Sequence, residues 1–210
     1  MKELFKTYKN IKPEIENRIS EFKSIWINAD EKDLFQELAF CLLTPQSKAE
    51  NAWKTIIKLR ENKKLFKADK NSISDDLNLV RFKNNKASYL VEARERFFIN
   101  SKGIRKTLSE MESVYEKRDW LNRNIKGYGL KESSHFLRNI GFVEDITILD
   151  RHILKNLKIF NVISEIPKTI SEKKYFEIEN RMKFFSNEIK IPLGHLDFIF
   201  WFNETKIIFK

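Results

Sequence analysis

The 210-residue chain has one cysteine, Cys41, and only five glycines and four prolines. A single cysteine excludes an internal disulfide, a four-cysteine iron–sulfur cluster and a cysteine-rich zinc site. No run approaches the roughly 20 uncharged apolar residues that a membrane-spanning helix needs, so no membrane association is expected. Residues 1–6 lack the apolar core and cleavage site of a secretory signal. We therefore expect a cytoplasmic protein.

The charge balance favours an anionic partner. Forty Lys and Arg residues oppose thirty Asp and Glu residues, a formal net charge of +10. Such a charge raises the local concentration of polyanions, of which nucleic acid is the commonest. A generally lysine-rich proteome would give the same composition, so charge alone does not decide between these two explanations.

Apolar residues recur at three- and four-residue spacing along most of the chain, which predicts an all-α protein. Asp30 or Asp33 can cap the first of these helices, and Thr44-Pro45 should end it. Short strand-like runs occur only at Ile146–Leu149 and Ile207–Phe209. The helices predicted in this way cover residues 31–43, 47–59, 86–99, 131–140, 171–189 and 193–202.

Three of the scarce glycines bound one helix. Gly127 and Gly129 precede residues 131–140, and Gly141 follows them, where a left-handed glycine would end a helix. The segment from Met111 to Ile125 has the pattern of a partner helix, so the sequence predicts a helix-hairpin-helix with a tight Gly-X-Gly turn. Positive φ at Gly127 and Gly129 would let the main chain approach a phosphate, with free helix amides pointing at it. An ordinary αα-hairpin remains the alternative.

Two further residues make this pattern more specific. Lys131 opens the second helix of the hairpin, and Asp150 follows 19 positions later, where an extended run meets a new helix. Taken together with the stretch 125–141, these residues make the sequence resemble the helix-hairpin-helix DNA glycosylases that carry a Gly/Pro-rich loop and an aspartate. Within these, it is similar to the type-2, archaeal-type 8-oxoguanine DNA glycosylase/AP lyases over nearly the whole chain, including the C-terminal Lys210.

The resemblance implies a bifunctional enzyme that flips and excises 8-oxoguanine and cleaves the abasic site through a Schiff base. Lys131 is then the nucleophile, and Asp150 stabilises the positive charge that develops on the sugar. The expected partner is double-stranded DNA containing oxidised guanine or abasic sites, bound by a monomer that is nucleoid-associated while it acts. No organic cofactor and no metal are implied. The resemblance gives the base pocket as Trp201, Lys210 and Phe198, and the DNA contacts as Lys126, Gly127, Gly129, Gln46, Phe82 and Arg151.

One segment departs from the closest family pattern. Where those members continue Ala-Asn after Thr44, this chain has Pro45-Gln46. A Leu-Thr-X-Gln sequence is more similar to the endonuclease III-type branch, whose glutamine enters the gap left by the flipped base. That branch generally carries a four-cysteine cluster, which one cysteine excludes here. Gln46 is therefore expected to fill the gap or to meet the orphan base.

The resemblance also implies two helical subdomains flanking a DNA-binding cleft. One joins residues 1–44 to 156–210, and the other covers 45–155 with the hairpin at 111–141. His135, His152 and His195 are interpreted as structural. Two alternatives stay open: a monofunctional glycosylase for an alkylated or mismatched base, and a non-catalytic hairpin module that binds DNA, in which Asp150 would be only a helix cap.

Overall fold

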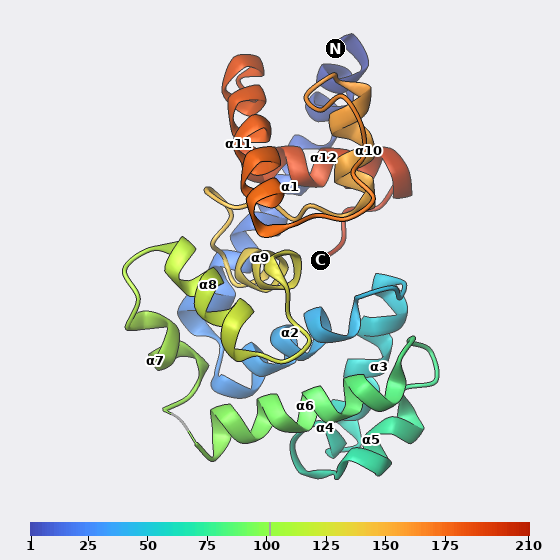
Figure 1. The fold of residues 1–210 in the computed structure, drawn as a ribbon, viewed down its shortest axis with the longest axis vertical. Helices are drawn as coiled ribbons and strands as arrows, with labels where there is room; N and C mark the ends of the chain where they lie inside the picture. The colour runs from blue at the N-terminus through green and yellow to red at the C-terminus, as the bar shows by residue number, and fades with distance from the viewer. Residues whose placement is uncertain (101) are drawn as a thin grey trace. The chain divides into compact units, whose positions relative to one another are not determined.

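The computed structural model describes residues 1–100 and 102–210, and these residues are helical along most of their length (Figure 1). None of the described helices is long and apolar enough to cross a membrane. The helices are α1 (Lys2–Asn28), α2 (Glu31–Leu43), α3 (Ala49–Glu61), α4 (Lys64–Lys67), α5 (Lys70–Asp76), α6 (Lys83–Phe98), α7 (Ile104–Ser109), α8 (Val114–Asn124), α9 (Leu130–Asn139), α10 (Arg151–Ile159), α11 (Glu172–Ile189) and α12 (Leu193–Thr205).

The all-α prediction is confirmed, and the predicted helices appear with small shifts at their ends. Asp30 caps α2 by accepting a hydrogen bond from the backbone N of Asp33 at 2.8 Å, and α2 ends just before Thr44. The strand-like runs at Ile146–Leu149 and Ile207–Phe209 do not form strands in the described part of the chain. Helix α1, which the spacing of apolar residues had not delimited, lies in the segment expected to be helical and continues through Pro13.

By its packing, the chain divides into two units. The terminal unit contains Met1–Ser24 and Leu137–Lys210, and the middle unit contains Ile25–Phe136. These boundaries differ from the sequence-based ones at 44/45 and 155/156. The first differs because α2 packs on α3, α6 and α7 and so joins the middle unit. Both divisions unite the N-terminal helix with the C-terminal helices.

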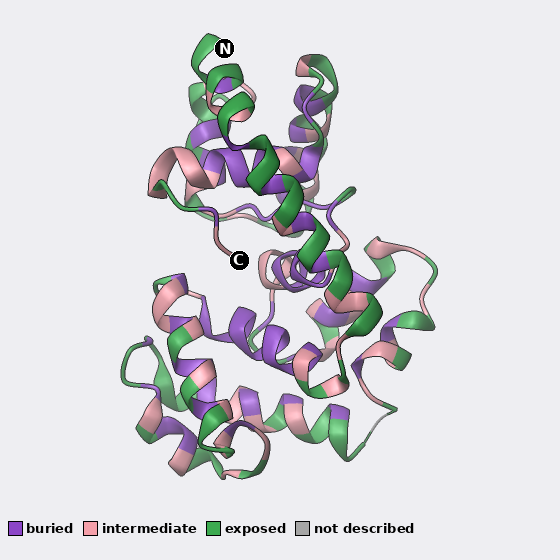
Figure 2. Cartoon of the chain, turned by 180° about the vertical axis from the view of Figure 1, so that it is seen from behind, coloured by how far each residue is buried: buried purple, intermediate pink, exposed green. Residues whose placement is uncertain are grey.

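Helix α2 forms the centre of the middle unit. Every residue from Leu34 to Leu43 is buried, including Gln36 and Glu37 (Figure 2). A helix that is buried on all sides must be covered by several neighbours, and here α3, α6 and α7 supply them. The loop that follows α2 and carries Gln46 therefore starts from a fixed point.

In the terminal unit, α12 packs on α10 and α11, and the first part of α1 adds a buried apolar stripe. A buried ion pair lies in this core: Arg138 Nη1 is 3.0 Å from Asp197 Oδ2, and both side chains are at most 10% exposed. The Arg138 guanidinium also lies over the rings of Phe22 and Phe198, 5.4 and 4.9 Å from their centroids. One arginine thus joins α1, α9 and α12.

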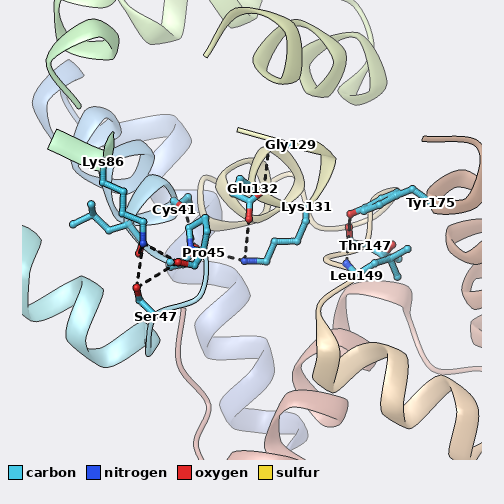
Figure 3. Close-up of polar contacts among 12 residues, drawn as sticks. Cys41, Pro45, Ser47, Lys86, Gly129, Lys131, Glu132, Thr147, Leu149 and Tyr175 are labelled. Atoms are coloured by element: carbon cyan, nitrogen blue, oxygen red, sulfur yellow. Dashed lines mark hydrogen bonds and ion pairs between the residues drawn. The ribbon is translucent and has the colours of Figure 1, made fainter. Parts of the chain in front are cut away.

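Side chains of α11 hold the run from Ile146 to Leu149 extended, in place of a partner strand. Tyr175 Oη donates to the Thr147 carbonyl at 2.7 Å and accepts from the Leu149 amide at 3.4 Å (Figure 3). The buried carboxylate of Glu179 accepts from the Thr147 amide at 2.9 Å. Because these bonds pair the amides of Thr147 and Leu149 and the carbonyl of Thr147, the segment stays extended without a neighbouring strand among the described residues.

Helix α9 ends as predicted at Gly141, which has a φ of +104°. The amide of Gly141 binds the Arg138 carbonyl, and the amide of Phe142 binds the Leu137 carbonyl at 2.9 Å. These two bonds form a Schellman motif. A Cβ on Gly141 would lie 2.8 Å from the Cα of Lys23, so the position excludes a side chain on two grounds.

Gly141→Ala should lower the free energy of unfolding by at least about 1–2 kcal/mol, because left-handed backbone disfavours a Cβ and the added atom meets backbone. Urea unfolding measures the loss. Gly129→Ala is the matched control, since Gly129 has no positive φ and its Cβ would meet only the flexible end of Glu132. Equal losses in the two variants would contradict this account of Gly141.

Candidate active site

The predicted hairpin is present, with α8 and α9 joined through residues 125–129. Helix α8, the turn and α9 as far as Phe136 belong to the middle unit. Gly127 has a φ of +87°, and a Cβ there would collide with the ring of Tyr89. Tyr128 anchors the turn from inside, since its hydroxyl donates to the Leu38 carbonyl of α2 at 2.7 Å. Burial raises the pKa of this phenol well above its ordinary value, so it remains a donor. The turn is thus fixed to the buried central helix.

One expectation about the turn is wrong. Gly129 does not have a positive φ; instead it precedes α9, and its amide donates to Glu132 Oε2 at 3.2 Å. A carboxylate that reaches back from the third helical position to the preceding amide is half of a capping box. The special backbone conformation of the turn therefore lies at Gly127 alone.

Lys131 occupies the second position of α9 and is partly accessible, with 25% of its side chain exposed. Its Nζ lies 3.5 Å from Glu132 Oε1 and 3.5 Å from the hydroxyl of Thr44 (Figure 3). The site around this amine is therefore made by α9 and by the loop after α2. His135, one turn further along α9, packs edge-on against Phe40, in agreement with a structural role.

The loop after α2 carries Gln46, which is exposed and has a left-handed φ of +53°. Phe82, which precedes α6, shares both properties: its φ is +60° and it is 53% exposed. The two loops are joined by a hydrogen bond of 3.0 Å from the Arg81 amide to Ser47 Oγ. The middle unit thus brings together the loops of Gln46 and Phe82, two of the expected DNA contacts.

A groove of about 680 Å³ lies beside the hairpin in the middle unit. Its lining includes Lys126 and Gly127, two of the expected DNA contacts, together with Trp120 and both acidic and basic side chains. Lys126 Nζ lies 3.3 Å from Glu92 and above the Tyr89 ring. Lys131 is not among the lining residues, so this groove is separate from the immediate surroundings of the amine.

In the terminal unit, Asp150 is the N-cap of α10. Its Oδ1 accepts from the backbone amides of His152 and Ile153 at 2.8 and 2.9 Å. Within the described residues, Oδ2 makes no hydrogen bond. The backbone leading to Asp150 is held by Tyr175 and Glu179, so the carboxylate is fixed from both sides.

The other expected site residues of the terminal unit differ in accessibility. Trp201 is partly exposed, and the His152 ring meets it edge-on at 4.8 Å between centroids. Lys210 is partly exposed, and Arg151 is exposed at the first position of α10. Phe198 is 1% exposed. The expectation that Phe198 stacks on a base is corrected, because its ring is enclosed by Phe22 and Arg138.

His195 has a structural setting in the same unit. Its Nδ1 lies 3.0 Å from the hydroxyl of Tyr8, and burial lowers the pKa of the imidazole. This agrees with the structural interpretation made from the sequence.

Comparison with known proteins identifies the family. Residues 15–191 match the model of a family described as 8-oxoguanine DNA glycosylase.

The chain belongs to the 8-oxoguanine DNA glycosylase family. It is 46% identical over 209 residues to the 8-oxoguanine DNA glycosylase/AP lyase of Fusobacterium nucleatum, covering 99% of this chain and 96% of that protein. The enzyme of the same name from Methanocaldococcus jannaschii is 39% identical over 202 residues, covering 95% of this chain and 93% of the relative.

The solved structures agree with this assignment. The crystal structure of the M. jannaschii 8-oxoguanine glycosylase/lyase in complex with a 15mer DNA containing 8-oxoguanine has a TM-score of 0.88, with 36% identity and full coverage of both chains. The resemblance to the archaeal-type 8-oxoguanine DNA glycosylases, and the helix-hairpin-helix fold that it implied, are confirmed.

Sequence reasoning missed Lys86, which is only 4% exposed. Burial lowers the pKa of its ammonium group to about 8, with a further lowering from the nearby charge of Lys131 and an opposing effect from Glu132. The signal was the position of this lysine on the buried stripe of α6 with Leu90, Ala93 and Phe97. This 8-oxoguanine DNA glycosylase family member therefore has a buried lysine, Lys86, near the amine of Lys131, which is expected to react.

The free energy of unfolding should depend on pH through Lys86. Between pH 8 and about 10.5 the unfolded chain binds the proton that the folded chain releases, so stability rises with pH relative to a Lys86→Met variant. The slope of the difference approaches about 1.4 kcal/mol per pH unit. Urea unfolding of both proteins from pH 6.5 to 9.5 measures it, and parallel curves throughout would contradict the assignment.

Proposed function

We propose that this chain excises 8-oxoguanine from double-stranded DNA and cleaves the resulting abasic site by β-elimination through a Schiff base. The observation that carries the proposal is the amine of Lys131 at the first turn of a helix-hairpin-helix, in a chain with relatives named 8-oxoguanine DNA glycosylase/AP lyase. Its amine is partly accessible and has a carboxylate and a hydroxyl 3.5 Å away.

The first step is base excision. The damaged nucleotide leaves the stack, and the amine of Lys131 attacks C1′ as the bond to the base breaks. The base leaves with the electrons of that bond and takes up the proton that the attacking nitrogen gives up. Positive charge develops on the sugar, and a fixed carboxylate beside it lowers the barrier. We assign that role to Asp150, whose cap geometry occupies Oδ1 and leaves Oδ2 without a hydrogen bond in the described residues.

The second step is strand cleavage. The sugar ring opens to a protonated imine on Lys131, which acidifies the C2′ hydrogen. Removal of that proton expels the 3′ phosphate, and water then hydrolyses the imine and restores the amine. Glu132, 3.5 Å from Lys131 Nζ, is the nearest described carboxylate for proton transfer. Every step uses side chains and water, so the proposal requires no organic cofactor.

The remaining assignments concern DNA binding. The hairpin turn at Gly127, together with Gly129 and Lys126, would contact the phosphate backbone, and Arg151 would do so at the start of α10. Gln46 and Phe82 would fill the stack that the flipped base leaves. Trp201 and Lys210 would bind the base. We propose that one chain acts on each lesion as a monomer in the cytoplasm, nucleoid-associated while it acts on DNA.

Lys131→Gln should abolish the borohydride-trapped adduct and strand nicking, while DNA affinity stays within a few-fold, because one amine forms the adduct and many contacts share the binding. The measurement is trapping on a duplex with 8-oxoguanine opposite cytosine, with affinity measured in parallel. Lys70→Gln, an exposed lysine at the start of α5, is the matched control and should trap normally.

An adduct formed by Lys131→Gln at the wild-type rate would show that another amine reacts. Release of free base by the wild-type protein without nicking or adduct would instead favour a monofunctional glycosylase.

Asp150→Asn should slow single-turnover excision by roughly 10²–10³-fold, the size of effect seen when a transition-state charge partner is lost. Folding should be nearly unchanged, since asparagine caps a helix about as well as aspartate. Asp69→Asn, at the corresponding cap of α5, should change neither property. A thermal melt beside the excision assay separates the roles; normal excision by Asp150→Asn would leave only the cap.

A further inference from the structure

Lys86 directs its buried ammonium group at one short loop of the middle unit. Its Nζ donates to the carbonyls of Leu43 and Pro45 at 2.7 and 2.8 Å, and to Ser47 Oγ at 3.1 Å (Figure 3). An ammonium group has three hydrogens, and three acceptors of the same loop use them. The acceptors lie on both sides of Gln46.

The loop needs such support because its backbone is unusual. Gln46 has a φ of +53°, a conformation that costs a residue with a Cβ roughly 1–2 kcal/mol. Backbone of this kind persists where the surrounding contacts over-determine it. Here the Ser47 amide also binds the Thr44 carbonyl at 2.9 Å, so two sets of contacts close the turn around Gln46.

The same contacts extend to the second loop. Ser47 Oγ, which accepts from Lys86, also accepts from the Arg81 amide at 3.0 Å. The next residue is Phe82, which has a φ of +60° and an exposed ring. The amide of Lys86 binds the Phe82 carbonyl at 3.0 Å in the first turn of α6. Lys86 and Ser47 therefore connect Gln46 and Phe82, which are both exposed and both have left-handed backbone.

We propose that Lys86, through Ser47 and the carbonyls of residues 43 and 45, is a positioning residue that fixes Gln46 and Phe82 for entry into the DNA stack. This inference rests on the proposed function, in which those two side chains replace the flipped nucleotide. A methionine would fill a similar volume without a charge to bury, so what the ammonium adds is the set of hydrogen bonds. Removing it leaves two loop carbonyls without their partner.

The test compares two substrates under single-turnover conditions. One is a duplex with 8-oxoguanine opposite cytosine, and the other is a single-stranded oligonucleotide with a preformed abasic site, which has no stack to fill. Lys86→Met should slow duplex excision about tenfold, in line with the loss of a buried polar partner. Cleavage of the single strand should stay within about twofold, as should both activities of the control Lys70→Met.

A double-mutant cycle distinguishes positioning from general destabilisation. In a Gln46→Ala/Phe82→Ala background, Lys86→Met should slow duplex excision by less than about twofold, because the residues that it positions are gone. Ser47→Ala removes one of the three acceptors of Lys86 and leaves the buried lysine in place. It therefore replaces Lys86→Met as the test variant if Lys86→Met does not fold. It should slow duplex excision about threefold in the wild-type background and leave the rate in the Gln46→Ala/Phe82→Ala background unchanged.

Equal slowing of both substrates, or the same slowing by Lys86→Met or Ser47→Ala with and without Gln46 and Phe82, would overturn the positioning role. A wild-type protein that acts on neither substrate would instead contradict the proposed function. The two failures are therefore distinguishable.

Discussion

The positions of the two proposed catalytic groups depend on where two helices begin. Lys131 stands at the second position of α9, whose start is set by the turn at Gly127 and by the bond from the Gly129 amide to Glu132. Asp150 is the N-cap residue of α10. A helix start presents free amides and a positive dipole, which favours anions nearby. The same local chemistry therefore serves an amine that must reach a polyanion and a carboxylate that is held in place by two helix amides.

The surroundings of Lys131 depend in turn on one buried helix. Helix α2 is buried from Leu34 to Leu43, holds Tyr128 of the hairpin turn, and leads directly into the loop of Thr44 and Gln46. The groups around the amine are thus fixed to the core of the middle unit. Burying the Lys86 ammonium beside them lowers the free energy of unfolding at neutral pH. Its hydrogen bonds in turn hold the loop around Gln46 in one conformation.

Much of the fold could be predicted because the helices and their ends depend on residues that are close together in the sequence. The stripe of 31–43, the cap at Asp30 and the glycine at 141 each act through neighbours in sequence, and each appears as expected. The failures have long-range causes. The run at Ile146–Leu149 is extended because Tyr175 and Glu179, about 30 residues away, satisfy its backbone. Phe198 belongs to an aromatic helix, and only the position of Arg138 shows that its ring is enclosed.

The same distinction holds for the site. Lys131 and Asp150 could be selected from the sequence because the hairpin and the cap around them are local patterns and the family resemblance implies their roles. The role of Lys86 instead depends on a loop about 40 residues away. For Asp150, the sequence left open whether the residue only caps α10 or is also catalytic, and the geometry is compatible with both roles together. A carboxylate has two oxygens, and the cap uses Oδ1 for both amides. Those bonds hold the group in one orientation. The cap can therefore prepare the carboxylate for the sugar cation.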